Sequence, residues 1–386
     1  MTLSSAREAK STKSKGLPHV RMCRFASSVL DVSSVQRPQN QLAMASVPCD
    51  TFHRNIDDIK RSKDDSLVLA CNNLCGTKWE GSVRIYAKLE DIPSLEKCVA
   101  SVNTDSTVTD IVPLNPGRFM LGLDSGGVEM IQLAQEEPHL LDTVFYKRDH
   151  DSGVTSLALS PDGRWLASTG WDYAIKVWDM SSMECSKTYV TGASPRTSTF
   201  PGSASCFCFL AHCDAVWKVV FSTDPNVFLS CSKDGKVKSW DMRLSKLATV
   251  LADDTCGPTT LDWQPLSASS YAVGQLSGSM VVRDLRQPNQ DVLRVELSQR
   301  PLRRILFCPE TPSLLAVCAD DSIVRVVDVL KTEDSIIYNS EEHTDFVRGL
   351  CWTGQHTLLS AAWDGRVLQH SVGPSPESGD APPSAQ

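Results

Sequence analysis

The sequence predicts an all-β protein, a seven-bladed β-propeller, from three observations. A short turn of the form Asp-Gly-x-hydrophobic, or a close variant of it, recurs seven times along the 386 residues. The seven copies begin at residues 79, 124, 171, 233, 276, 320 and 363. Their spacings of 45, 47, 62, 43, 44 and 43 residues match the roughly 40 to 45 residues of a four-stranded propeller blade, with one long insertion.

Each copy reads as the turn of a β-hairpin. Strand-like runs such as LVLACNN, VFLSCS and TLLSAA precede the turns, and a second run with alternating pattern follows each of them. An isolated blade cannot bury both of its faces, so seven of them must stack radially to form a core. We expect the propeller to span 47–372, with the first blade at about 48–90 and Phe52 to Ile59 supplying the strand that closes the ring against blade seven.

Three segments lie outside the repeat. Residues 1–46 are Ser-rich, basic and without periodicity, which predicts a disordered leader; a transit peptide, which has the same composition, is the alternative. The run beginning Met44-Ala-Ser would make an ordinary start for a shorter protein. The insertion at 191–205 explains the 62-residue spacing and reads as a surface loop. The Pro- and Ser-rich segment 373–386 predicts a disordered tail.

Charge and cysteine content indicate which ligands and which cellular compartment suit the chain. The leader carries seven basic and two acidic residues, so a net charge of −13 remains for the rest of a chain whose total is −8. An acidic body disfavours nonspecific nucleic-acid binding and makes basic protein tails plausible ligands. The 14 cysteines are dispersed through strand-like runs, which favours buried free thiols and a reducing compartment. No apolar run approaches the length of a membrane span.

Two blades carry a nearly complete set of polar markers. The third has His150, Asp172, Trp178 and Asp179; the fourth has His212, Asp234, Trp240 and Asp241. In this set the chain resembles the WD-repeat family, whose blades carry a His before the first strand, a turn Asp and a Trp-Asp at the end of the third strand. The resemblance implies a buried His-Ser/Thr-Asp network with a structural role.

The remaining blades have lost part of the set. The seventh keeps His343 and Asp364 but has His370 where Trp is expected, and the fifth has Arg283 and Asp284. Blades one and two are recognisable mainly by their period.

The sequence offers no catalytic constellation. The run Asp124-Ser125-Gly126-Gly127 superficially resembles a protease nucleophile segment, but it fills the turn slot of blade two and has no predicted base beside it. Cys206, Cys208, His212 and Cys213 form the main ligand-rich cluster, and their spacing fits no common zinc module. We expect no catalytic residue, cofactor or metal, and no clustered acids at the central channel.

The surface carries one stronger signal. The slot just before the turn acid is normally polar, yet it holds Trp79, Trp171 and Trp363 in blades one, three and seven. Equivalent turns lie on one face of a propeller, and blades seven and one are neighbours, so Trp79 and Trp363 are predicted to form one aromatic patch. Exposed Trp is enriched among binding hot spots. The alternative is that each indole folds back onto its own hairpin.

Several segments also resemble the WD-repeat subunits of the methylosome, which partner the type II (symmetric) protein arginine methyltransferase. They are KWEGSVRIY, VFLSCSKDGKVKSWDMR and the ending HTDFVRGLCWTGQHTLLSAAWDGRVLQHSV, and the resemblance spans about 48–372. It implies a non-catalytic scaffold that stabilises the enzyme in a hetero-octamer. It further implies that the subunit helps to present histone and Sm-protein substrates in the cytoplasm and nucleus.

The resemblance also assigns site residues. Trp79 occupies the position of the family's principal anchor into the enzyme, and the resemblance aligns Tyr338 with a second aromatic contact. The alternative for Tyr338 is a position in the core. A rival interpretation is a substrate receptor of a cullin-RING ubiquitin ligase, because Trp240 to Arg243 form a Trp-Asp-x-Arg box. Many WD blades match that box by chance.

Overall fold

The computed structural model describes residues 54–75, 77–134, 139–190, 212–244, 249–253, 256–288 and 290–373. All of them belong to the compact unit Ala45–Gln386. The predicted leader at 1–46, the loop at 191–205 and the tail beyond Gly373 lie outside these residues, so these boundaries stay predictions.

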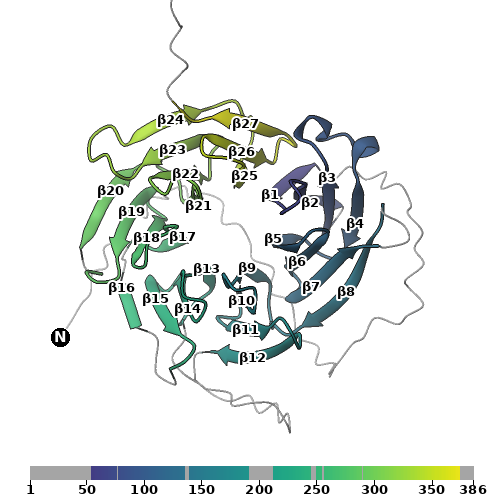
Figure 1. The fold of residues 1–386 in the computed structure, drawn as a ribbon, viewed down its shortest axis with the longest axis horizontal. Helices are drawn as coiled ribbons and strands as arrows, with labels where there is room; N and C mark the ends of the chain where they lie inside the picture. The colour runs from purple at the N-terminus through teal and green to yellow at the C-terminus, as the bar shows by residue number, and fades with distance from the viewer. Residues whose placement is uncertain are drawn as a thin grey trace, which may run out of the picture. The chain divides into compact units, whose positions relative to one another are not determined.

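The described residues form seven antiparallel sheets arranged as blades around a centre (Figure 1). Blade one has β1 (Asn55–Arg61), β2 (Leu67–Cys75), β3 (Lys78–Tyr86) and β4 (Ala100–Thr104). Blade two has β5 (Val108–Asn115), β6 (Arg118–Leu123), β7 (Gly127–Leu133) and β8 (Leu141–Arg148). Blade three has β9 (Val154–Leu159), β10 (Trp165–Gly170), β11 (Ile175–Asp179) and β12 (Glu184–Tyr189).

The other four blades follow the same order. Blade four has β13 (Val216–Phe221), β14 (Val227–Ser232), β15 (Lys236–Asp241) and β16 (Thr249–Asp253). Blade five has β17 (Pro258–Trp263), β18 (Ser270–Gln275), β19 (Ser279–Asp284) and β20 (Asp291–Glu296). Blade six has β21 (Leu302–Phe307), β22 (Leu314–Ala319), β23 (Val324–Asp328) and β24 (Ile336–Ser340). Blade seven has three described strands, β25 (Val347–Trp352), β26 (Thr357–Ala362) and β27 (Val367–Ser371).

The predicted all-β, seven-bladed propeller is therefore confirmed. The part of the chain that the structure describes contains no α-helix, and its helical turns are two short 3₁₀ segments, η2 (Leu89–Asp91) and η3 (Leu95–Lys97).

The core is divided among seven apolar clusters, each built from two neighbouring blades. The cluster between blades seven and one contains Ile56 and Ile59 from β1 together with Leu359 and Ala361 from β26. Each blade thus buries both faces only because its neighbours are present, which explains why the fold needs a full ring.

The predicted closing segment, Phe52 to Ile59, does meet blade seven through β1, but by packing and not by strand pairing; Phe52 and His53 lie outside the described residues. Strand β1 pairs with β2 as the innermost strand of blade one and does not join the sheet of blade seven. It meets blade seven by side-by-side packing on β25. A Cβ atom at Gly349 would come within 2.9 Å of the backbone nitrogen of Ile59, so the two strands approach as closely as glycine allows.

Every innermost strand carries a register shift near its start, which leaves one residue of each blade unpaired. These bulge residues are Asp57, Thr109, Thr155, Trp217, Thr259, Arg303 and Arg348. Because a bulge re-aims a side chain, these positions supply side chains to the same face as the hairpin turns.

Candidate protein-docking face

The marker residues of blades three and four lie together as hydrogen-bonded networks. His150 Nδ1 lies 2.9 Å from Asp172 Oδ2, and its Nε2 lies 2.8 Å from Ser168 Oγ, which also accepts a 2.9 Å bond from the Trp178 indole. Blade four repeats these contacts. Burial raises the pKa of Asp234, but its bonds and charge interaction with His212 outweigh burial and lower that pKa to about 2. The network satisfies buried polar groups and is closed to solvent.

Blade seven extends the same network into blade six. His343 contacts Asp364 and Ser360, and Ser360 Oγ lies 2.7 Å from Nε2 of His370, the residue that replaces the expected Trp. The other ring nitrogen of His370 lies 3.0 Å from the Tyr338 hydroxyl. Tyr338 is on β24 of blade six, partly buried, and packed against the core, so the structure separates it from the predicted aromatic patch.

Trp79 and Trp363 are brought together across the junction of blades one and seven. Their ring centroids are 6.3 Å apart, and Phe346 packs edge-on against Trp363 at 5.8 Å. The Arg348 guanidinium lies 4.8 Å from the Trp363 ring centre. Trp363 also donates a 2.6 Å hydrogen bond from its indole to Asp57, so it is anchored, whereas Trp79 is 43% exposed.

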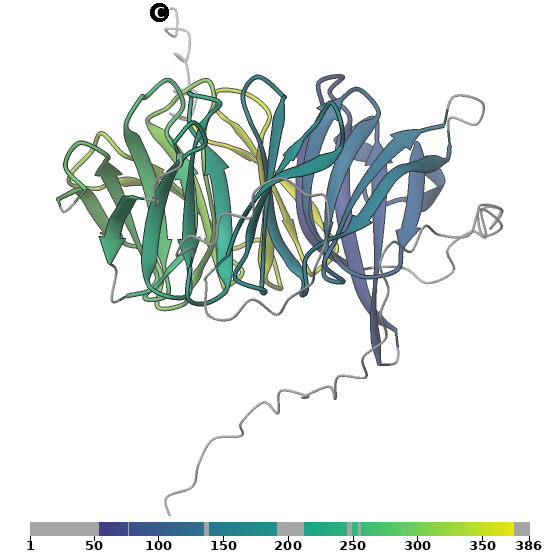
Figure 2. The ribbon, with the colours of Figure 1, turned by 90° about the horizontal axis from the view of Figure 1, so that it is seen from below.

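The first hairpin differs from the prediction in register. Trp79 lies within β3, not at the turn, because the turn between β2 and β3 comes earlier, after Cys75. Both strands have nine residues, and the hairpin reaches beyond the other blades at one face (Figure 2). Leu74, 51% exposed, pairs directly opposite Trp79.

Sequence reasoning missed Leu74 and Phe346. Phe346 precedes β25, where the marked blades three and four have Gly153 and Ala215, and its carbonyl accepts the backbone N–H of Trp363 just as Gly153 accepts that of Trp171. That alignment could have revealed an unusual aromatic. Leu74 becomes visible only once the hairpin register is known. We call Leu74, Trp79, Phe346 and Trp363 the docking patch.

Trp171 lies apart from this patch, in blade three. It is 42% exposed and packs edge-on against Trp217 of β13, with ring centroids 4.8 Å apart. Trp79, Trp171 and Trp363 are therefore divided between two clusters.

The expectation that the central channel has no clustered acids is wrong. Asp58 and Asp110 are buried on the inner strands β1 and β5, and cations from other blades surround them. Lys218 lies 3.0 Å from Asp110, and Arg304 pairs with Asp58. Burial alone would raise the pKa of Asp110, but the charges of Lys218, Lys60 and Arg304 hold it well below its usual range. Such neutralised acids stabilise the ring and are unsuited to general acid–base work.

No group of potential metal ligands occurs among the described residues. Cys206 and Cys208 lie outside them, and His212 is occupied by the blade-four network. Asp124, Ser125 and Gly126 form the turn between β6 and β7. No described helix is long and apolar enough to cross a bilayer.

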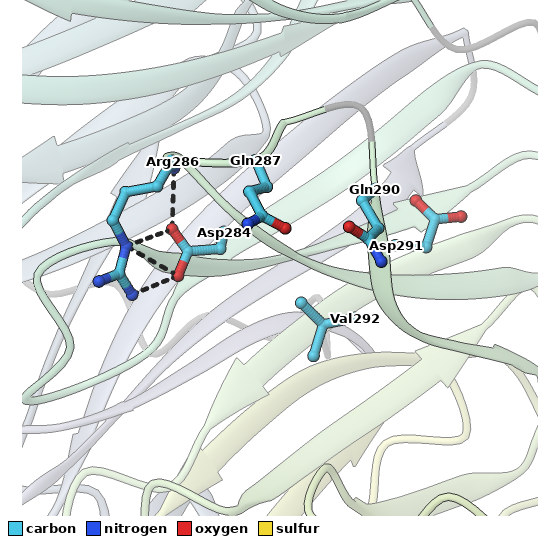
Figure 3. A pocket seen from close by; sticks show the side chains of 6 residues that line it. All are labelled: Asp284, Arg286, Gln287, Gln290, Asp291 and Val292. Carbon is cyan, nitrogen blue, oxygen red and sulfur yellow. Dashed lines mark hydrogen bonds and ion pairs between the residues drawn. The ribbon is translucent and has the colours of Figure 1, made fainter.

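A groove of about 500 Å³ lies in blade five, away from the two tryptophan clusters (Figure 3). Both of its acids are already engaged. The Arg286 side chain folds back onto Asp284 with an Nη2 to Oδ2 distance of 2.6 Å, and Arg283 lies 2.8 Å from Asp291. The Trp240-to-Arg243 box has the same internal pairing. Arg243 contacts Asp241 through Nε and Nη2, and it also reaches Asp224 at 3.1 Å.

Comparison with known proteins agrees with this architecture. The repeat described as "WD40: WD domain, G-beta repeat" matches residues 142–179, 204–241 and 335–370. The outer-coat vertex of COPII on membranes has the same fold, with a TM-score of 0.66 at 17% identity over 84% of this chain and 86% of that one. The chain is therefore a seven-bladed β-propeller in which three segments match the WD repeat.

Among individual proteins, the chain is related to methylosome protein WDR77 of Xenopus laevis. The two are 28% identical over 322 residues, which cover 82% of this chain and 89% of that protein. Target of rapamycin complex subunit wat1 of Schizosaccharomyces pombe is 24% identical over 68% of this chain and 74% of that protein.

Proposed function

We propose that this chain is a non-catalytic scaffold subunit of a methylosome. In this proposal it docks on a type II protein arginine methyltransferase, stabilises it in a hetero-oligomer, expected to be a hetero-octamer, and helps to present histone and Sm-protein substrates in the cytoplasm and nucleus. The relation to WDR77 and the resemblance of the first hairpin and the chain's ending support this assignment.

The docking patch is the observation that carries the proposal. Leu74 and Trp79 project from the longest hairpin, and Phe346, 39% exposed, extends the apolar surface toward Trp363. Exposed apolar side chains of this size are costly in water unless a partner covers them. Trp is also the residue type whose truncation most often costs an interface about 2 kcal/mol or more. We therefore assign the anchoring role to Trp79.

The rival role as a ubiquitin-ligase receptor has weaker support. The Arg243 guanidinium is held by Asp241 and Asp224 of its own blade, so its box has a local role in fixing the turn after β15. An adaptor would have to compete with these two carboxylates.

Affinity purification of the tagged full chain from cells tests both roles. We expect recovery of a type II arginine methyltransferase, loss of that enzyme with Trp79→Ala, and full retention with Arg243→Ala. Recovery of a ligase adaptor that disappears with Arg243→Ala, without any methyltransferase, would replace the proposed function by the rival one.

A further inference from the structure

A second aromatic cluster lies in blade three, where Trp171 and Tyr173 flank the turn residue Asp172. Both rings are largely exposed, at 42% and 44%, and Trp171 is braced by Trp217. A braced indole presents a fixed aromatic face to solvent, unlike a side chain that lies flat on its own hairpin.

The backbone at Tyr173 is strained, because this residue has a positive φ angle. Its φ of +65° is in the left-handed region, and the equivalent turn position of blades two, four, five and seven is a glycine with φ between +77° and +87° (Gly126, Gly235, Gly278 and Gly365). A tyrosine is strained there and a glycine is not. Strained backbone conformations cluster at functional sites, and among the described positive-φ residues Tyr173 is the one aromatic.

Blade seven has a cation over its turn tryptophan, and the equivalent cation is absent from the described part of blade three. In blade seven, the bulge residue Arg348 lies over the equivalent tryptophan, Trp363, at 4.8 Å. The bulge residue of blade three is Thr155, whose hydroxyl bonds to Thr169 and to the carbonyl of Val216. Within the described residues, no cation lies over Trp171 or Tyr173, so their faces can accept a guanidinium from outside the chain.

The surrounding charge favours the same ligand. The Asp124 carboxylate lies over Gly153, where a Cβ atom would come within 2.5 Å of its Oδ1, and the Gly153 carbonyl accepts the backbone N–H of Trp171. Asp151 is exposed on the neighbouring loop. Neither carboxylate has an ion pair within the described part of the chain, whereas Lys176 of blade three and Lys233 of blade four are paired with Asp149 and Asp214.

We propose that Trp171 and Tyr173 bind the guanidinium group of an arginine in an extended, cationic segment of a partner protein, with Asp124 and Asp151 supplying the opposing charge. The planar guanidinium stacks on aromatic faces and pairs with carboxylates, which suits this cluster better than a lysine ammonium. The site is separate from the docking patch. Only its biological use, the presentation of arginine-rich substrates, rests on the proposed function.

Fluorescence anisotropy with the full chain and a labelled peptide of alternating arginine and glycine tests this inference. We expect Trp171→Ala to weaken peptide binding about tenfold, and Asp151→Asn to weaken it less and to reduce its salt dependence. A peptide with lysine in place of arginine should bind more weakly, and one with glutamine should not bind. Trp79→Ala should leave peptide affinity unchanged while removing the methyltransferase, which separates failure of this site from failure of the proposed function.

Tyr173→Gly gives a second, sharper test. Glycine relieves the left-handed strain, so the variant should unfold at a higher temperature than the unaltered chain yet bind the peptide more weakly. A purely structural role predicts no loss of binding from a stabilising change. Unchanged peptide affinity in both Trp171→Ala and Tyr173→Gly, or equal affinity for the glutamine peptide, would overturn the inference.

Discussion

At the scale of single residues, the two tryptophans at the junction of blades one and seven have different surroundings. The Trp363 indole donates to Asp57, which also accepts from Asn72. Burial raises the pKa of Asp57, and these hydrogen bonds offset part of that effect. Trp79 packs on Trp363 but is 43% exposed. Trp363 therefore contributes to folding and Trp79 chiefly to the surface.

Truncating each tryptophan should separate these contributions. We expect Trp363→Ala to lower the free energy of unfolding by about 1–3 kcal/mol, since a buried carboxylate loses its donor. Trp79→Ala should change it by no more than about 0.5 kcal/mol. Urea unfolding measures both, and Trp363→Phe serves as the control that keeps a ring without the donor. Equal losses from the two alanine variants would contradict this division.

His370 gives the blade-seven network a pH dependence. Burial, aided by the charge of His343, lowers the pKa of His370 from 6.5 to about 4. The folded state therefore binds fewer protons than the unfolded state below pH 6.5. The stability from neutral His370 is complete above pH 6.5 and is lost as the pH falls toward 4.

The unfolding free energy should accordingly fall by up to about 1.4 kcal/mol per pH unit on acidification through this window from His370 alone. His370→Gln removes the titrating group, so its stability profile should be shallower over the same range. Chemical denaturation at a series of pH values measures the two slopes. Parallel profiles would show that His370 does not titrate as described.

At the scale of elements, the β2–β3 hairpin sets the position of the docking patch. Its nine-residue strands place Leu74 opposite Trp79, whereas the equivalent hairpins of the other blades have strands of five to seven residues. The extra length raises both side chains above the neighbouring turns, where a partner can cover them.

A charge at the tip of this hairpin should block docking without unfolding the blade. Leu74→Asp places a carboxylate in the apolar patch, so we expect methyltransferase binding to weaken about tenfold or more. Because Leu74 is exposed in the free chain, the melting temperature should stay nearly the same. Leu330→Asp, at a 78% exposed position just after β23 of blade six, is the matched control. Equal binding by both variants would remove Leu74 from the patch.

The number of blades could be predicted from the sequence, but the register of the β2–β3 hairpin could not. The recurring turns gave the seven blades correctly because each turn needs particular residues at a fixed spacing. The register of blade one could not be read in the same way, since a hairpin can be extended by adding pairs to both strands without changing the pattern. The contact between Trp79 and Trp363 could be predicted because blades one and seven are neighbours in a closed ring. The place of Leu74 in the patch depends on the hairpin register, and that of Phe346 on its packing against Trp363.

At the scale of the whole molecule, charges in the central channel join distant blades. Asp58 of blade one, Asp110 of blade two, Lys218 of blade four and Arg304 of blade six form one network of alternating sign. Single-sequence reasoning missed this network because its members are separated by up to 246 residues. Together with the seven inter-blade apolar clusters, it links the blades into one ring.

Breaking one pair of the network should destabilise the whole ring. Asp110→Asn leaves Lys218 without its nearest partner, and we expect a loss of about 3 kcal/mol in unfolding free energy. Replacing both residues, with Asp110→Asn and Lys218→Met, should cost less than the sum of the single changes. A double-mutant cycle measured by denaturation gives the coupling. Strictly additive losses would mean that the two groups do not interact.

The central claim is that the docking patch anchors a type II arginine methyltransferase. The most direct test is an equilibrium titration of the purified enzyme with the unaltered chain and with Trp79→Ala, after confirming that both unfold at the same temperature. We predict that the substitution raises the Kd about 30-fold or more, corresponding to a hot spot of about 2 kcal/mol. An unchanged Kd, or no measurable binding by the unaltered chain, would contradict the claim.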